Sequence, residues 1–385
     1  MSGPGGGRVM VEDTRIDSTA DTHGSPRGRA TGGTDSETGS TGWRVPGEPE
    51  TPQLDKGIPH HLLVCLDRSP ESECLIRHAT ALAKAWRARV TFIHVLESAA
   101  REGAPHPADA VDWCLRRQEA RRYLAEVMSI SVHEDLKIQM ALAEGRAFEE
   151  IQAWSKSNAV DLTILSTHGE RGRTDCGLSG TAYKLIDGSS GSVLVVPAGE
   201  TREIPTAEAS YKRILVPLDG SLHAESALPI AAQLAAAHGA EIVLAHVVEA
   251  PELMRSRLPT AADRALEQAV IERNESVARD YLTEARNRLE DLRFEVVTYL
   301  GRNGNPREEL LRFIHDEAID LVVLSAHGAT GATDRALGSV AAHLVAHARV
   351  PLLLSRHRTT PRLREDRASS PSYTESARLP SAMTA

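Results

Sequence analysis

The sequence predicts an α/β protein made of two tandem domains, each with a doubly wound sheet of five parallel strands in the order 3-2-1-4-5 and about four helices. Three observations support this prediction. The chain has 385 residues, which favours two or three domains over one. Its sequence repeats once, and each repeat alternates short apolar runs with amphipathic stretches. Such alternation is typical of parallel sheets with right-handed crossovers.

The repeat is visible as matched segments far apart in the chain. LLVCLDRS at 62–69 matches ILVPLDGS at 214–221, and DLTILSTHG at 161–169 matches DLVVLSAHG at 320–328. The offset is 152 residues for the first pair and 159 for the second. A period of this length is too long for a solenoid and is typical of domain duplication.

The apolar runs are the expected strands. ILVPL, IVLAHV and LVVL in the second repeat are nearly continuous and rich in β-branched residues, as in strands buried on both faces. Between such runs, the stretch 264–290 has apolar residues at helical spacing, and Asn305-Pro306 places proline in the first turn of another helix. The strands expected in the second repeat are 213–218, 241–247, 293–300, 320–325 and 350–355. The helices expected in the first repeat are 70–87, 109–132, 146–157 and 179–188.

Composition predicts where the domains begin and end. Residues 1–57 hold 12 of the 28 glycines and only ten apolar residues, too few to offset the entropy of ordering the segment. The predicted organisation is a disordered tail at 1–57, a first domain at 58–198, a linker at 199–210, a second domain at 211–357 and a disordered tail at 358–385.

Charge and cysteine usage exclude several classes of protein. The net charge of −9 argues against a protein that binds nucleic acid through a broad basic face. No apolar run approaches the roughly 18–20 residues of a membrane span, and no apolar signal segment follows Met1. The four cysteines have no metal-ligand spacing, which favours reduced thiols. We therefore expect a soluble cytoplasmic protein that binds neither nucleic acid nor membrane.

Polar residues and glycines follow the first and fourth strands of each repeat. In the second repeat Asp219 follows the first strand, Gly328 follows the fourth, and Gly338-Ser339 opens a helix. If these strands are neighbours, both loops face one crevice, where doubly wound sheets bind ligands. A carboxylate can accept hydrogen bonds from a ribose hydroxyl or an adenine amine. Glycines and a helix start let backbone N–H groups approach phosphate.

These segments resemble the universal stress protein family, with one Rossmann-like domain at about 60–197 and another at 211–356. The family has the nucleotide motif G-x2-G-x9-G-[ST] after its fourth strand. The second repeat keeps the spacing, with Ser325 in place of the first glycine, then Gly328 and Gly338-Ser339. The resemblance implies that the chain binds ATP, with or without Mg²⁺, mainly in the second domain.

The resemblance also implies individual roles. Asp219 is expected to contact the adenosine and Val247 to contact adenine through its backbone. The site residues expected in the second domain are Pro217, Leu218, Asp219, Val247, Ser325, His327, Gly328, Gly338, Ser339 and Val340. In the first repeat the motif ends in the inverted order Ser179-Gly180, and Cys65 stands where the second repeat has Pro217. The weaker site expected there comprises Asp67, Val95, Gly169, Ser179 and Gly180. Neither a catalytic residue nor a metal site is predicted.

Structural roles compete with these functional ones. Asp67 and Asp219 could cap the helices that follow them. The glycines could supply turns with positive φ. No nucleophile or carboxylate stands at a telling distance from His168 or His327, so a loop histidine bonded to backbone is the favoured interpretation. The histidines interpreted as structural are His94, His168, His246 and His327.

Three functions stay open at this point. The first is a stress-response regulatory protein that binds an adenine nucleotide, which stabilises one conformation and alters partner contacts. The second is at most a slow ATP hydrolase, which would need a Mg²⁺ ligand and a positioned water. The third is an interaction scaffold that binds no nucleotide.

The two domains are expected to pair with each other. Domains of the family commonly join through their last strands, here 192–197 and 350–355. Both segments are apolar enough to be hazardous as open sheet edges. An internal pseudo-dimer would pair both edges, and a homodimer and an unidentified protein partner stay open.

Overall fold

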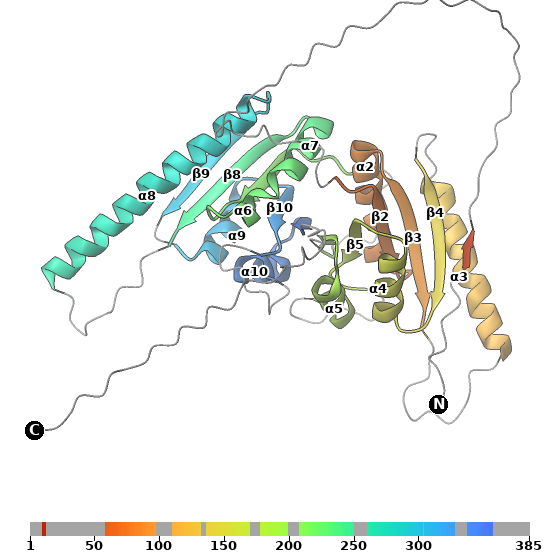
Figure 1. Ribbon diagram of the computed structural model, residues 1–385. Helices are drawn as coiled ribbons and strands as arrows, with labels where there is room; N and C mark the ends of the chain where they lie inside the picture. The colour runs from red at the N-terminus through yellow and green to blue at the C-terminus, as the bar shows by residue number, and fades with distance from the viewer. Residues whose placement is uncertain are drawn as a thin grey trace, which may run out of the picture.

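The computed structural model describes residues 10–12, 58–97, 110–131, 136–169, 178–198, 208–249, 260–302, 304–327 and 337–356. It confirms the predicted fold class, because each of two tandem domains has a parallel sheet with helices on both faces (Figure 1). The predicted tails, apart from residues 10–12, and most of the predicted linker lie outside the described residues.

The bounds of the elements follow the predicted pattern closely. The first domain has strands β2 (His61–Leu66), β3 (Arg89–Leu96), β4 (Ile138–Glu144), β5 (Leu162–Ser166) and β6 (Ser192–Val196). Its helices are α1 (Pro70–Glu73), α2 (Leu75–Trp86), α3 (Ala110–Ser131), α4 (Ala147–Ser157) and α5 (Gly180–Gly188). The second domain has strands β7 (Arg213–Pro217), β8 (Glu241–Val248), β9 (Val296–Arg302), β10 (Leu321–Ser325) and β11 (Leu352–Ser355). Its helices are α6 (Leu222–Glu225), α7 (Leu228–His238), α8 (Ala261–Glu290), α9 (Pro306–Asp316) and α10 (Ser339–His347).

Each domain has five described helices rather than about four, because a one-turn helix precedes the first long one. In the first domain the predicted helix 70–87 is divided at Cys74 into α1 and α2. Ser69 caps the short helix with its side chain, and Pro70 occupies its first position.

All the described strands belong to one sheet in the order β1-β4-β3-β2-β5-β6-β11-β10-β7-β8-β9. The order within each domain is 3-2-1-4-5, as the sequence predicts. The domains join where β6 and β11 pair antiparallel, with Leu194 opposite Leu353 and Val195 opposite Leu352. The last strands of the two repeats therefore pair as expected, and neither is left as an apolar edge.

Strand β1 (Met10–Glu12) lies within the segment 1–57, of which the structure describes only residues 10–12. It pairs antiparallel with β4, with Met10 opposite Leu142 and Glu12 opposite Met140. Without β1, β4 would be the outer strand of the first domain, and its outward N–H and C=O groups would be open to pairing. Composition alone gave no sign of this contact.

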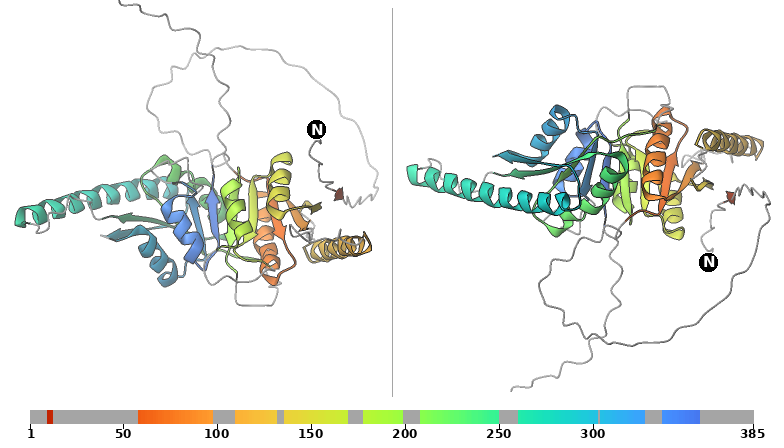
Figure 2. Two further views of the ribbon diagram at one scale, coloured as in Figure 1. Left: turned by 90° about the horizontal axis from the view of Figure 1, so that it is seen from below. Right: turned by 90° about the horizontal axis from the view of Figure 1, so that it is seen from above.

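Two apolar layers cover the two faces of the sheet, and both run across the domain boundary. Successive strand residues point to opposite faces, so Leu194 and Leu353 belong to one layer and Val193 and Leu352 to the other. Helices α2, α3, α7 and α8 cover the first face, and α4, α5, α9 and α10 the second. The longest helices, α3 and α8, lie at opposite ends of the molecule (Figure 2).

Tyr211 bridges the domains on the side of α2 and α7. It is 1% exposed, and its hydroxyl lies 2.9 Å from Nδ1 of His78 in α2. Its ring also meets the ring of His238 in α7 edge-on, with centroids 5.0 Å apart. Just before it, the N–H of Ala209 donates to the carbonyl of Arg77 at 3.3 Å. The chain that enters the second domain therefore packs on a helix of the first.

Arg356 bridges the domains on the other face. Its guanidinium donates to the carbonyl of Ile186 at 2.7 Å and to that of Ser189, at the C-terminal end of α5. Its backbone N–H donates to Ser192 Oγ at 3.2 Å. A cation at the C-terminal end of a helix is favourable because of the helix dipole, so Arg356 stabilises a helix of the other domain.

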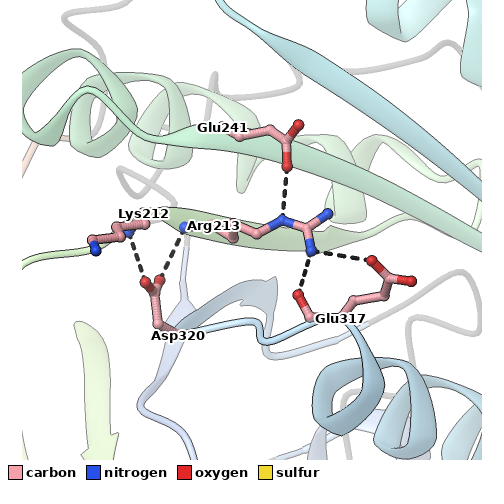
Figure 3. Close-up of polar contacts among 5 residues, drawn as sticks. All are labelled: Lys212, Arg213, Glu241, Glu317 and Asp320. Atoms are coloured by element: carbon pink, nitrogen blue, oxygen red, sulfur yellow. Dashed lines mark hydrogen bonds and ion pairs between the residues drawn. The ribbon is translucent and has the colours of Figure 1, made fainter.

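The amino ends of the strands are fixed by an aspartate in each domain. Asp320 accepts hydrogen bonds from the backbone N–H groups of Lys212 at 2.7 Å and Arg213 at 3.2 Å (Figure 3). The Arg213 side chain donates to Glu241 at 2.7 Å and to the carbonyl and carboxylate of Glu317. These hydrogen bonds raise the pKa of Arg213 further above its usual range.

The first domain repeats the arrangement with Asp161, which accepts from the N–H groups of His60 at 2.9 Å and His61 at 3.1 Å. The two aspartates open the matched segments DLTILSTHG and DLVVLSAHG. They lie at the end of the sheet opposite the expected ligand crevice, so their role is structural.

We expect His78 to make the stability of the protein sensitive to acid. Burial between the domains lowers its pKa to about 3, whereas the unfolded chain binds this proton near pKa 6.5. The unfolding free energy should therefore fall as the pH drops below 6.5, by about 1 kcal/mol from this group at pH 5.5. Urea unfolding at pH 7.5 and 5.5 should show a smaller loss for His78→Gln than for the wild type. An equal loss in both proteins would contradict this assignment.

Candidate functional site

The first and fourth strands, which were predicted to flank a crevice, are neighbours in both domains. β2 pairs with β5, with Leu62 opposite Leu162, and β7 pairs with β10, with Ile214 opposite Leu321. The winding reverses at these pairs, which is where doubly wound sheets bind ligands. Because β6 and β11 are antiparallel, the two carboxyl edges, and hence the two candidate sites, face opposite directions.

A cavity of about 330 Å³ lies at the carboxyl edge of the first domain. Four of the five residues expected there line it: Asp67, Val95, Gly169 and Ser179. The fifth, Gly180, is exposed at the start of α5. The volume lies at the lower end of the range for small-molecule pockets, which is roughly 300–1,000 Å³.

Asp67 and Gly169 are in close contact across this cavity. A Cβ atom built on Gly169 would lie 1.9 Å from Asp67 Oδ2, so no larger residue fits there while the carboxylate keeps its place. Oδ1 of Asp67 accepts from the backbone N–H and the hydroxyl of Ser69, at 3.1 and 2.6 Å. The glycine is therefore required by close approach, not by a positive φ.

Two polar atoms beside the cavity are buried without a hydrogen-bond partner in the described part of the chain. They are Ser166 Oγ and His168 Nε2, and both residues line the cavity. His168 Nδ1 lies 3.0 Å from Thr167 Oγ1, so the histidine is bonded to a side chain and not to backbone as expected. A buried unpaired polar atom costs about 1–3 kcal/mol, which a hydrogen-bonding ligand would recover.

The sequence interpretation did not assign Ser166 or His168 to the first site. Ser166 aligns with Ser325, and His168 with His327, which were both assigned to the second. The repeat alignment could therefore have found them. It could also have found Thr181, which aligns with Val340, but not Arg116 of α3, which lines the cavity as well.

Cys65 lines the same cavity, and its thiol is unreactive. Burial raises the pKa of its thiol to about 12, so the side chain is uncharged at neutral pH.

In the second domain Asp219 repeats the geometry of Asp67. Its Oδ1 accepts from the N–H and the hydroxyl of Ser221, at 3.0 and 2.6 Å. Ser221 in turn caps α6 by accepting from the N–H of Ala224 at 3.1 Å. The aspartate thus orients the capping serine and is not itself the cap, which refines the structural interpretation of both aspartates.

The ends of the first and second strands are tied together by a histidine in each domain. His246 Nδ1 lies 2.8 Å from the carbonyl of Leu218, and His94 Nδ1 lies 2.8 Å from that of Leu66. Leu218 also donates its N–H to the carbonyl of Ala245 at 2.8 Å. These bonds fix the backbone beside Pro217 and Val247, which gives His94 and His246 a structural role in the two domains.

The helix starts differ between the two sites. Ser179 begins α5 and accepts from the N–H of Ala182 at 3.2 Å, so the helix is capped by its own side chain. Gly338 occupies the matched place at α10 and has no side chain to cap with. The backbone N–H of Ser179 donates to the carbonyl of Thr167 at 2.8 Å. In the same way, the N–H of Gly338 donates to the carbonyl of Ala326 at 2.8 Å.

Other expected residues of the second site surround this helix start. Ser339 is exposed, and Val340 is partly buried against the second apolar layer. Ser325 Oγ accepts from the N–H of His327 at 3.4 Å. Gly328 lies outside the described residues.

Among the described residues there is no cluster of three or more histidine, cysteine or acidic side chains that could hold a metal ion. In the same part of the chain, none of the helices has the length and apolar character needed to cross a membrane.

The model of the universal stress protein family matches residues 59–197 and 210–356. The chain belongs to the universal stress protein family. Universal stress protein Rv2005c of Mycobacterium tuberculosis is 24% identical over 306 residues, which cover 77% of this chain and 97% of that protein. Universal stress protein MJ0577 of Methanocaldococcus jannaschii is 26% identical over 158 residues, which cover 39% of this chain and 98% of that protein.

The fold has a counterpart among solved structures. A universal stress protein from Archaeoglobus fulgidus superposes with a TM-score of 0.53 at 18% identity, covering 78% of this chain and 98% of that one. At this identity the likeness concerns the fold alone, and it extends over both domains of this family member.

We expect Gly169→Ala to disturb the first site. The new methyl group would collide with Asp67, so the carboxylate or the loop must move, at a cost of about 1–3 kcal/mol. Gly180→Ala is the matched control, since a Cβ there meets no atom within 4 Å. Thermal unfolding should show a lower midpoint for Gly169→Ala and none of that loss for Gly180→Ala. Equal midpoints would contradict the contact between Asp67 and Gly169.

Proposed function

We propose that this protein is a stress-response regulatory protein that binds ATP or a related adenine nucleotide, mainly in its second domain. The observation that carries the proposal is the start of α10, where Gly338 leaves the first turn of the helix without a side-chain cap. The matched residues of the first domain, Asp67 and Ser179, line one cavity, which supports the same proximity for Asp219 and Gly338.

The expected contacts follow from the chemistry of each group. The Asp219 carboxylate would accept from the ribose hydroxyls, and the backbone at Val247 would meet the adenine. The N–H groups that open α10 would donate to phosphate oxygens, which the positive end of the helix dipole attracts. Mg²⁺ would be held mainly through the phosphates, because Mg²⁺ usually keeps waters and few protein ligands.

The first domain is proposed to bind phosphate less well. Ser179 already occupies the N–H of Ala182. The cavity also holds the carboxylates of Asp67, Glu97 and Glu119, and Glu119 pairs with Arg68 at 3.7 Å. These carboxylates disfavour a triphosphate, although the cavity keeps room and unpaired polar atoms for a less charged ligand.

A bound nucleotide could act on partner contacts through α10. This helix packs on β11, which pairs with β6 of the first domain. Ligand contacts at its first turn would therefore bias an element of the domain interface, within the limit set by the ligand's differential affinity for two conformations. We propose the cytoplasm as the place of action, which the unpaired Cys65, Cys74 and Cys114 support.

Nucleotide binding can be tested directly on the full chain. The purified protein is denatured and the released small molecules are separated by chromatography, and calorimetric titration with ATP, ADP and AMP follows. We expect adenine nucleotide in the released fraction or saturable heat with ATP. If neither appears, the chain is an interaction scaffold and the proposal fails.

The assignment to the second domain is tested by Gly338→Val. Gly338 has φ −63° and ψ 161°, a conformation open to valine, so the domain should still fold. The side chain would stand where phosphate approaches, and we expect affinity for ATP to fall tenfold or more. Gly180→Val makes the same change at the glycine that opens α5, one residue after the position matched to Gly338. Unchanged affinity in Gly338→Val with loss of binding in Gly180→Val would reverse the assignment.

A further inference from the structure

The two ends of the eleven-stranded sheet differ. At the end formed by the first domain, β1 pairs with β4. At the end formed by the second domain, β9 is the last of the described strands, next to α8 (Figure 1). The described part of the sheet therefore has one strand edge that is covered and one that is open.

The two edges are equivalent positions of the repeated domain. Val90 of β3 pairs with Ile138 of β4, and the matched Ile242 of β8 pairs with Val296 of β9. The positions 140–142, which bind β1, therefore correspond to 298–300.

The helix beside each edge does not block it. α3 packs on β3 and β4, yet β1 reaches β4. α8 packs on β8 and β9 in the same way. An antiparallel strand can therefore reach the edge of β9 just as β1 reaches β4.

Backbone geometry identifies the groups that face the open edge. The N–H of Ile242 donates to the carbonyl of Glu295 at 2.9 Å. In a strand the residues that bond to a given neighbour alternate, so Val296, Thr298 and Leu300 direct their N–H and C=O groups away from β8. The same rule in the first domain turns Met140 and Leu142 outward, and these are residues that β1 opposes.

The sequence of β9 lacks the usual protection of an open edge. It reads VVTYLGR, without proline and without a charge before Arg302. Val297 is 39% exposed, and Thr298 is exposed as well. On neighbouring α8, Leu266 and Val277 are 58% and 50% exposed, and their spacing of about three turns places them on one side of the helix.

We propose that the open edge of β9 pairs antiparallel with β9 of a second copy of the chain, so that two sheets join about a two-fold axis. The chain already joins its own two domains by antiparallel pairing of equivalent strands, β6 and β11. Full overlap of the two β9 strands centres on Tyr299 and sets Thr298 opposite Leu300 of the second copy. Because β1 covers the other end of each sheet, the assembly stops at two copies.

The test is the mass of the full chain in solution by light scattering after size exclusion, over a range of concentrations. We expect twice the chain mass for the wild type. Thr298→Pro removes an outward donor without touching the bonds to β8, and should give the mass of one chain with an unchanged circular dichroism spectrum. Thr298→Val, which keeps the N–H, is the matched control and should stay dimeric.

Two results would overturn the proposal: a wild type of single-chain mass at every concentration, or a Thr298→Pro variant as dimeric as Thr298→Val. If Thr298→Pro does not fold, hydrogen exchange of the wild type decides. The amides of Val296, Thr298 and Leu300 should then be protected at high concentration and exchange quickly on dilution. Rapid exchange of these three amides at high concentration would also overturn it.

Discussion

In an isolated domain β6 or β11 would be an apolar edge strand, and their antiparallel pairing removes both edges at once. The two-fold relation between the domains follows from this pairing, and so do the two apolar layers that cross the boundary. Tyr211 and Arg356 add one polar bridge on each face. The direction of the pairing also places the two carboxyl edges on opposite sides of the molecule.

The two candidate sites share the aspartate and the histidine that follow or flank the first strand, and they differ at the start of the neighbouring helix. Asp67 and Asp219 each accept hydrogen bonds from a capping serine, and His94 and His246 contact the equivalent carbonyls of Leu66 and Leu218. The difference lies at the helix that faces the aspartate. A serine cap satisfies the first turn of α5, whereas the glycine at α10 leaves it for a ligand. A one-residue inversion in the sequence thus separates a helix start capped by a serine side chain from one without a side-chain cap.

The sequence alone predicted the elements whose signal repeats. The strands, the pairing of the first with the fourth strand and the aspartates that follow the first strand all fall in matched segments such as LLVCLDRS and ILVPLDGS. Contacts that a single residue makes with a distant part of the chain leave no repeated pattern in the sequence. Tyr211 is a lone aromatic residue after the expected linker, and Arg356 lies next to the expected tail, yet each bridges the domains. Strand β1 is three residues within a glycine-rich stretch, with no periodicity to mark it.

If the hydrogen bonds between β6 and β11 join the two domains into one cooperative unit, the two domains should unfold together. Native-state hydrogen exchange of the full chain measures this most directly, through the opening free energies of amides in β6, β11 and the central strands β2 and β7. The account predicts that the protected amides of all four strands exchange with one opening free energy, equal to that of global unfolding. A lower opening free energy for β6 and β11 than for β2 and β7, or a different value for each domain, would contradict it.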